Sequence, residues 1–385
     1  MSIFMSSGEV SGDHYTACIA KELRKNGYRG ELWGMGGRES KEAGVRCAWN
    51  GEQLQLLGVV EVLRAIPSLF KLRDEIVHEI LQRSPSVVLV ADSPDFHMPL
   101  ISGLRKNGYK GKVVYISPPS VWAWRSRRAE ALAQWVDLCL PLFRFEHDYL
   151  SEHGCKSFWK GHPLVEEFSA EAEEDAQLKV FASEGKLVAL LPGSRRSEIQ
   201  SLFPLLSVVY KGLEAEGWLP VFSVAPGLNS DAAEGLNRLL EEGHYRSYCG
   251  RGRDLMAASA AVVGSSGTAT VEAMLLERYM VIVYKVHPVT ALIGRLLLHN
   301  RFFGIPNLLA GEEFFPEFVQ DRAQPDAVLK SVLGWLNGSI EEREQIKMKM
   351  KILAQSMGTP GVYADWVREI LKLSEESQSD GAHHV

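Results

Sequence analysis

Small residues between an apolar segment and a predicted helix could bind a phosphate group. Residues 260–263 are apolar, and Ser266, Gly267 and Thr268 follow them closely. Small side chains let a diphosphate approach the backbone N–H groups, and the helix dipole adds partial positive charge there. Glu272 lies about one and a half turns further on, where its carboxylate could accept hydrogen bonds from ribose hydroxyls. The same pattern equally fits a buried strand, turn and helix in which Ser266 is an N-cap and Glu272 is solvated.

Two carboxylates follow a second apolar segment and could do acid–base chemistry. Residues 87–91 are apolar throughout, which is typical of a strand covered on both faces, and Asp92 comes directly after them. A carboxylate held by rigid sheet and partly shielded from water can serve as a general base. Asp95 fits a turn or helix-capping residue, although the two roles could be exchanged, and a structural role for both aspartates competes with catalysis.

A glycine-containing turn follows the first apolar segment, residues 3–5. It contains Glu9, Ser11, Gly12 and Asp13. In an open α/β sheet such a turn lies at the carboxyl edge of the strands, where ligands bind. The turn lacks the G-x-G-x-x-G pattern of dinucleotide-binding proteins. Its acidic residues are therefore either polar ligands of a sugar or ordinary turn and cap residues.

The strands that must position these residues alternate with helical segments along the chain. This alternation predicts two Rossmann-like, doubly wound parallel-sheet domains that face each other across a cleft, followed by C-terminal helices. We expect an N-terminal domain at 1–165, a second at 166–340, C-terminal helices at 341–373 that pack back on the first domain or on a partner, and a disordered tail at 374–385. The expected strands are residues 3–5, 32–35, 87–91, 113–116, 138–140, 186–191, 220–224, 245–248 and 260–263. The expected late helices are residues 326–336, 341–357 and 361–373.

Composition narrows the class of protein. The chain has 385 residues and 46% hydrophobic content, enough for two cores, and its net charge of -6 argues against a general nucleic-acid binder. The five cysteines are widely spaced and form no C-x-x-C pair, so we expect neither disulfides nor zinc, and a reducing cytosol fits best. No signal peptide is recognisable, and no apolar run reaches the 18 or so residues of a membrane span. We expect a soluble or peripheral protein.

Two segments mix apolar and basic residues and could contact a membrane or acyl chains. They are residues 59–73 and 291–303. Such a face can lie on an anionic membrane, although a helix packed on both sides gives the same pattern. The candidate contact residues are Val59, Val62, Leu63, Leu69, Leu72, Leu297 and Phe302.

Seven motifs in series resemble those of the lipid-A-disaccharide synthase family, from the first strand to about residue 311. They are Ser-Gly-Glu-Val-Ser-Gly-Asp at 7–13, Asp-Ser-Pro-Asp-Phe at 92–96, Val-Trp-Ala-Trp at 121–124, Gly-His-Pro at 161–163, Leu-Leu-Pro-Gly-Ser-Arg at 190–195, Ser-Gly-Thr-Ala at 266–269 and Pro-Asn-Leu-Leu-Ala-Gly at 306–311. The chain departs from the family's pattern by an extra residue at Pro119 and Ser120, and by Arg144 where a proline is usual.

The resemblance implies a GT-B type glycosyltransferase of lipid A biosynthesis. Such an enzyme joins UDP-2,3-diacylglucosamine to 2,3-diacylglucosamine 1-phosphate, giving a β-1,6 disaccharide and UDP. It needs no cofactor, contacts the cytoplasmic face of the inner membrane peripherally, and could be a homodimer. The donor-binding residues that it implies are Gly193, Ser194, Ser266, Gly267, Thr268, Glu272 and Asn307, beside a substrate cleft with Glu9, Ser11, Gly12 and Asp13.

The chemistry can also be argued from the residues. Asp92 could take the proton of the attacking hydroxyl, while Arg195 and the helix start at Ser266 could stabilise the departing diphosphate. No D-x-D, H-x-H or H-E-x-x-H pattern indicates a metal. Direct attack predicts a single displacement with inversion. A UDP-sugar 2-epimerase and a non-catalytic nucleotide-sugar sensor remain alternatives.

Overall fold

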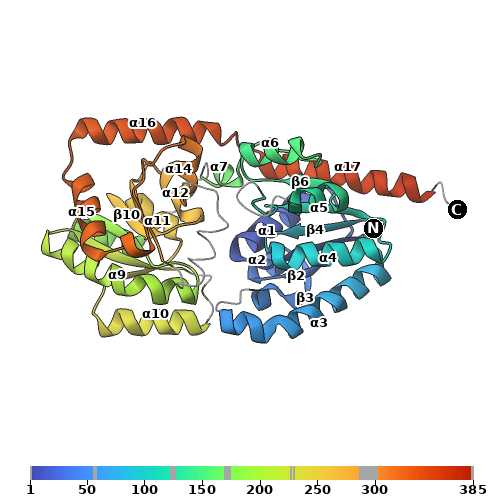
Figure 1. The fold of residues 1–385 in the computed structure, drawn as a ribbon, viewed down its shortest axis with the longest axis horizontal. Coiled ribbons are helices and arrows are strands. Elements are labelled where there is room, and N and C mark those ends of the chain that lie inside the picture. Colours follow the sequence, from blue (N-terminus) through green and yellow to red (C-terminus); the bar gives the residue numbers. More distant parts are fainter. Residues whose placement is uncertain are drawn as a thin grey trace. The chain divides into compact units, whose positions relative to one another are not determined.

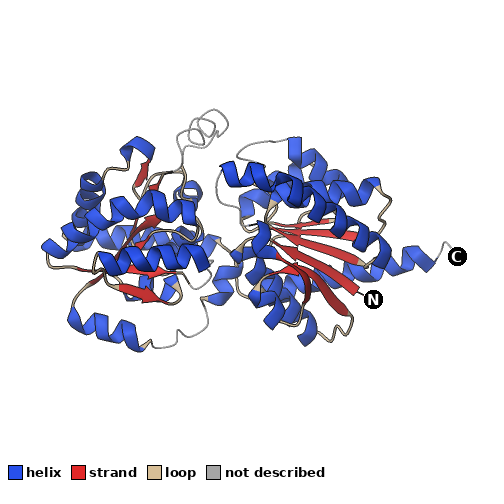
Figure 2. Cartoon of the chain, turned by 90° about the horizontal axis from the view of Figure 1, so that it is seen from below, coloured by secondary structure: helices blue, strands red, loops and turns tan. Residues whose placement is uncertain are grey.

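The chain divides into two units that each contain a parallel sheet. The computed structural model describes residues 2–54, 59–121, 127–168, 175–225, 228, 230–285 and 302–382. Unit 1 consists of Met1–Glu167 and Met357–Val385, and unit 2 consists of Phe168–Ser356. Helices pack against the sheet of each unit (Figures 1 and 2). The prediction of two doubly wound parallel sheets is confirmed.

The sheet of unit 1 has the strand order β3-β2-β1-β4-β5-β6, all parallel. β4 is apolar because both of its faces are covered. Val88 and Val90 pack into a core with α3, α4 and α5, while Val87 and Leu89 pack into a second core with α1 and α17. The strands are β1 (Ser2–Ser7), β2 (Glu31–Gly36), β3 (Arg46–Asn50), β4 (Val87–Ala91), β5 (Lys112–Ile116) and β6 (Leu138–Leu140). The helices are α1 (Val10–Lys25), α2 (Arg38–Glu42), η1 (Gly51–Leu54), α3 (Val59–Arg83), α4 (Pro94–Lys106), α5 (Arg127–Trp135), α6 (Arg144–Glu152), α7 (Pro163–Glu167) and α17 (Val362–Ala382).

The sheet of unit 2 repeats this topology with the order β12-β11-β10-β7-β8-β9. The neighbouring strands are again parallel. The strands are β7 (Leu187–Leu191), β8 (Leu219–Val224), β9 (Ser247–Cys249), β10 (Ala261–Ser265), β11 (Met280–Tyr284) and β12 (Glu317–Val319). The helices are α8 (Ala176–Glu184), α9 (Arg196–Ala215), α10 (Ser230–Glu242), α11 (Gly252–Ala258), α12 (Thr268–Leu275), α14 (Ile305–Ala310), η2 (Gln320–Arg322), α15 (Pro325–Leu336) and α16 (Ile340–Ser356).

Three strands were not predicted from the sequence. β3 and β12 are edge strands with polar residues, so they lack the apolar pattern of a central strand. β11 is an apolar run with the pattern of a buried strand.

The predicted C-terminal helices divide between the two units. α16 belongs to unit 2, and α17 belongs to unit 1. The tail predicted to be disordered from residue 374 is helical up to Ala382. Ser374 is 1% exposed and its Oγ lies 3.1 Å from Ser86 Oγ, so a tertiary contact holds the start of this polar segment. Among the described residues, no helix is both long and apolar enough to cross a membrane.

Candidate active site

The glycine-containing turn and Asp92 lie at the point where the strand order of the first sheet reverses. β1 and β4 are neighbours at this point, with β2 on one side and β5 on the other. Connections leave the two strands in opposite directions, which opens a crevice at their carboxyl ends in doubly wound folds. The Gly8 N–H lies 3.4 Å from Asp92 Oδ1. The structure therefore brings together two candidates that are far apart in sequence.

One oxygen of the Asp92 carboxylate is held by hydrogen bonds, and the other is buried without one. Oδ1 accepts a hydrogen bond from Ser93 Oγ at 2.5 Å and the weaker one from Gly8. Oδ2 is buried and accepts no hydrogen bond from the described residues. A buried acceptor without a donor carries a desolvation cost, so its presence at a sheet switch point is typical of a functional group.

The environment of Asp92 suits a base that works near neutral pH. Burial raises the pKa of Asp92 and the negative charge of Glu9 adds to this effect, while hydrogen bonds from Ser93 and from the Gly8 and Glu9 backbone lower it. The net pKa is about 7. A catalytic base is most effective when its pKa lies near the working pH. Asp95 is instead paired with Arg128 on the surface.

Gly12 provides the space that the Asp92 carboxylate occupies. It lies in the first turn of α1, and a Cβ at this position would collide with Asp92 Oδ2. Glu9 stands at the N-cap position of α1, and both Glu9 and Ser11 are half-buried. The roles of Glu9, Ser11 and Gly12 in binding substrate stay predictions.

Asp13 is tied to the loop that follows β2. Its Oδ1 accepts hydrogen bonds from the Gly37 N–H at 2.7 Å and from Ser40 Oγ at 2.5 Å, and its Oδ2 accepts one from the Glu39 N–H at 3.0 Å. The side chain thus satisfies backbone donors at the start of α2. This contact gives Asp13 a structural role beside the predicted one.

Ser6, His97 and Tyr115 surround the Asp92 main chain and were not predicted as site residues. Asp92 and Ser93 have φ values of 52° and 42°, in the left-handed region. Such a conformation costs a non-glycine residue about 1–3 kcal/mol, so it persists only where the surroundings hold it. His97 and Tyr115 both hydrogen bond to the Asp92 carbonyl, and His97 also bonds to Ser6. Their only sequence signal is their position at or after strand ends.

The phosphate-binding candidates of unit 2 also lie at a switch point. β7 and β10 are neighbours there, with β8 and β11 outside them. After β7 the chain turns at Gly193, where φ is 109°, and Arg195 stands at the N-cap of α9. Glu198 organises this turn, because it accepts the Ser194 N–H at 3.0 Å and forms an ion pair with Arg195 at 3.4 Å. Arg195 is exposed.

The turn after β10 opens α12 as predicted. Gly267 has a φ of 137° and stands at the N-cap, and a Cβ at this position would meet no atom within 4 Å. Open space beside backbone N–H groups at a helix start is suited to an anion. Ser266 is half-buried and donates through Oγ to the Phe303 carbonyl at 2.9 Å. Glu272 is half-buried in the second turn of α12, and its contact with ribose stays a prediction.

Tyr284 at the end of β11 connects the two turns of unit 2. Burial raises the pKa of its hydroxyl, the charge of Glu198 adds to this effect, and the charge of Arg195 opposes it. The ring of Tyr284 stacks on Phe303 with centroids 5.4 Å apart. The Phe303 carbonyl in turn accepts the Ser266 hydroxyl. Tyr284 was missed because the strand that carries it was missed.

The structure corrects the prediction that Asn307 contacts the donor. Asn307 is 0% exposed. Its Nδ2 donates to the Phe315 carbonyl and Glu317 Oε1, and its Oδ1 accepts from the N–H groups of Phe314 and Phe315. An amide has two donors and two acceptor sites, and all are in use. Asn307 is therefore a structural residue that fixes the start of β12.

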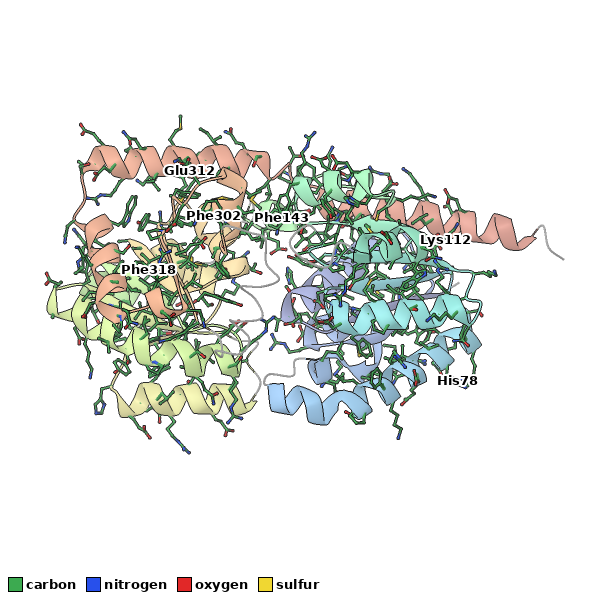
Figure 3. All side chains as sticks on the ribbon, viewed as in Figure 1. His78, Lys112, Phe143, Phe302, Glu312 and Phe318 are labelled. Carbon is green, nitrogen blue, oxygen red and sulfur yellow. The ribbon has the colours of Figure 1, made fainter. Side chains whose placement is uncertain are left out.

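The predicted membrane contacts have mixed outcomes. Leu72 is 8% exposed and packs in the core of unit 1, so its prediction as a membrane or acyl contact is wrong. Leu69 and Phe302 are half-buried, and Phe302 is labelled in Figure 3. Leu297 and the side chains of Val59, Val62 and Leu63 lie outside the described residues.

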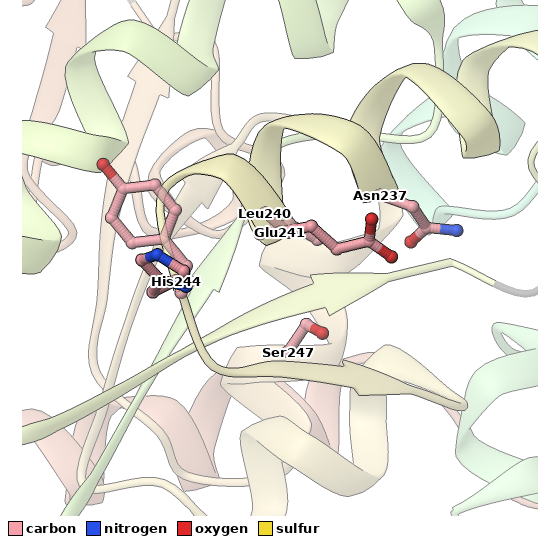
Figure 4. A pocket seen from close by; sticks show the side chains of 6 residues that line it. Asn237, Leu240, Glu241, His244 and Ser247 are labelled. Atoms are coloured by element: carbon pink, nitrogen blue, oxygen red, sulfur yellow. The ribbon is translucent and has the colours of Figure 1, made fainter.

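A separate pocket lies beside β9 and α10 (Figure 4). The lining residues are Asn237, Leu240, Glu241, His244, Tyr245 and Ser247. None of the predicted site residues is among them. Within the described part of the chain, no group of three or more His, Cys, Asp or Glu residues is placed to hold a metal ion.

The fold with two Rossmann-like units has counterparts among solved structures. UDP-GlcNAc 2-epimerase from Neisseria meningitidis, bound to UDP-GlcNAc, aligns with a TM-score of 0.63 and 12% identity over 97% of this chain and 100% of its own. Trehalose 6-phosphate synthase from Burkholderia multivorans aligns with a TM-score of 0.56 and 10% identity over 99% of both chains. At such low identity these likenesses show the fold alone, which is of the GT-B type.

Sequence relatives define the family. Residues 3–359 match the family described as lipid-A-disaccharide synthetase. The lipid-A-disaccharide synthase of Alcanivorax borkumensis is 33% identical over 92% of this chain and 93% of its own length. That of Acinetobacter baylyi is 32% identical over 95% of both. The chain belongs to the lipid-A-disaccharide synthase family of glycosyltransferases, which confirms the predicted resemblance.

Proposed function

We propose that the chain joins UDP-2,3-diacylglucosamine to 2,3-diacylglucosamine 1-phosphate and releases UDP. The supporting observation is the Asp92 carboxylate, which stands at a sheet switch point with one buried oxygen free of hydrogen bonds. Family membership supports the choice of substrates.

In this mechanism Asp92 Oδ2 takes the proton from the 6-hydroxyl of the acceptor. The oxygen attacks the anomeric carbon of the donor as the bond to the diphosphate breaks. Arg195 and the N–H groups at the start of α12 stabilise the negative charge that develops on UDP. Because no covalent intermediate forms, the product is the β-1,6 disaccharide with inverted configuration. These protein groups supply the positive charge that a divalent metal supplies in other transferases.

Incubation with the two lipid substrates tests the proposal. Mass spectrometry should detect the disaccharide 1-phosphate together with one equivalent of UDP, and NMR should show the β configuration. Asp92→Asn should bind UDP without forming product. Two results would point to other functions. Conversion of the UDP-sugar without an acceptor would indicate a 2-epimerase, and UDP binding without turnover in the wild-type protein would indicate a sensor.

The proposal includes peripheral contact with the cytoplasmic face of the inner membrane, since both substrates carry acyl chains. Half-buried Leu69 and Phe302 remain the candidate contacts among the described side chains. A homodimer is also proposed, and sedimentation velocity of the purified protein would test it.

A further inference from the structure

His97 contacts the main-chain carbonyl of Asp92 and is completely buried. It occupies the first turn of α4, five residues after Asp92. Its ring meets Tyr115 edge-on with centroids 6.2 Å apart. No surface of the imidazole is open to solvent, so His97 cannot touch a substrate.

The hydrogen bonds of His97 define which ring nitrogen carries the proton. Nδ1 lies 2.8 Å from the Asp92 carbonyl, which can only accept, so Nδ1 is the donor. Nε2 must then accept, and the Ser6 hydroxyl 2.8 Å away is its donor. Burial lowers the pKa of His97 to about 4, which keeps the ring neutral at physiological pH.

The Asp92 carbonyl receives a second hydrogen bond from the Tyr115 hydroxyl at 2.8 Å. The two donors come from α4 and β5, and Ser6 adds a link to β1. They hold the left-handed backbone at Asp92, which the residue would otherwise leave for a lower-energy conformation.

We propose that His97 is a positioning residue for the base, which fixes the main chain of Asp92 and thereby holds its carboxylate at the switch point of the sheet. Tyr115 assists through the same carbonyl. This inference rests on the proposed function of Asp92. The titratable groups around Asp92 in the described structure are Glu9, whose charge acts on the carboxylate, and His97 and Tyr115, which contact the main-chain carbonyl.

Variants of His97 separate the two hydrogen bonds. His97→Asn places an amide N–H near the position of Nδ1 and keeps the donor to the carbonyl. His97→Gln places its amide near Nε2 and keeps only the link to Ser6. His97→Phe keeps the volume and loses both. We expect kcat to fall on the order of 10- to 100-fold for the Gln and Phe variants, as for a misplaced catalytic group, with little change in KM and with the Asn variant close to wild type.

The pKa of Asp92 provides a readout that does not depend on turnover. Carboxyl NMR of the protein labelled with ¹³C-aspartate, with Asp92→Asn to assign the signal, should show the pKa of Asp92 falling from about 7 towards its ordinary value in His97→Phe. The cause would be a carboxylate that relaxes into solvent. The low-pH limb of the kcat profile should move with it. Tyr115→Phe keeps the aromatic ring and leaves His97 in place. It should shift the pKa of Asp92 and the low-pH limb of the kcat profile in the same direction by a smaller amount.

An unchanged pKa and pH profile in both His97→Phe and Tyr115→Phe would overturn the proposal, as would a Gln variant as active as the Asn variant. If His97→Phe does not fold, Tyr115→Phe and His97→Gln decide alone. An active Asp92→Asn variant would reject the base itself, whereas the NMR result would still report whether His97 positions that side chain.

Discussion

The backbone of Gly12 lies so close to the carboxylate of Asp92 that a Cβ at position 12 would collide with Oδ2. The carboxylate that we propose as the base therefore faces the first turn of α1. The raised pKa of Asp92 follows from this enclosure.

Gly12→Ala should displace the carboxylate and lower kcat/KM by about 10- to 100-fold while the protein stays folded. Gly235→Ala is a matched control, because Gly235 lies in α10 with no atom within 4 Å of an added Cβ. Steady-state kinetics and circular dichroism would check both variants. Full activity of Gly12→Ala would show that the carboxylate position is not critical.

Asp92→Asn should lower kcat by about 100- to 10,000-fold, since the amide cannot accept the proton. In the wild-type enzyme kcat should rise with pH through about 7, as Asp92 ionises. A rate that is flat between pH 5 and 9 would contradict this assignment.

Asp92→Asn should also make the folded protein more stable than wild type at high pH. The folded pKa of Asp92 is about 7 and its ordinary value is 3.8, so between these pH values the folded state holds a proton that the unfolded chain releases. The free energy of unfolding therefore falls as pH rises through this window, by at most about 4 kcal/mol for this group. Denaturant melts at pH 5 and pH 8 should show wild type losing stability relative to Asp92→Asn at the higher pH. If the difference in unfolding free energy between the two proteins is the same at both pH values, the pKa of Asp92 is close to its ordinary value.

Arg195→Ala should weaken UDP binding by on the order of 10-fold and lower the rate further, because charge builds up on the leaving group in the transition state. Arg196→Ala removes the same charge one residue away and is the control, as Arg196 is exposed on the first turn of α9. Calorimetry with UDP and kinetics in the presence of EDTA would check the prediction. If both variants lose UDP affinity and rate equally, the effect comes from the overall positive charge and not from the position of Arg195. Loss of activity in EDTA would show that the reaction needs a metal ion.

Leu69→Ser and Phe302→Ser should reduce sedimentation with anionic vesicles, since each removes apolar surface that could enter the lipid interface. Activity on detergent-dispersed substrate should fall less than vesicle binding. Leu72→Ser serves as the comparison, because it buries a hydroxyl in the core and should lower the melting temperature instead. Unchanged vesicle binding in both Leu69→Ser and Phe302→Ser would remove these two residues from the membrane contact.

The sequence by itself determined the local units of this protein. The apolar run that became β4 and the small residues before α12 have signals that depend only on neighbours along the chain. For the same reason it identified Asp92 as a strand-end carboxylate and Arg195 as a residue at a helix start. Seven motifs in order were enough to indicate the family.

Only the tertiary structure decided which of these residues share a site and which are structural. Strand order places Gly8 beside Asp92, although 84 positions separate them. Asn307 belongs to a family motif and Leu72 to an amphipathic segment, yet both side chains are buried in the structure. Asn307 is also held by hydrogen bonds. His97 has no pattern of its own, because its role arises from contacts with Ser6 on β1 and with the Asp92 carbonyl after β4. Such contacts form between segments distant in sequence, where periodicity and spacing carry no information about which atoms meet.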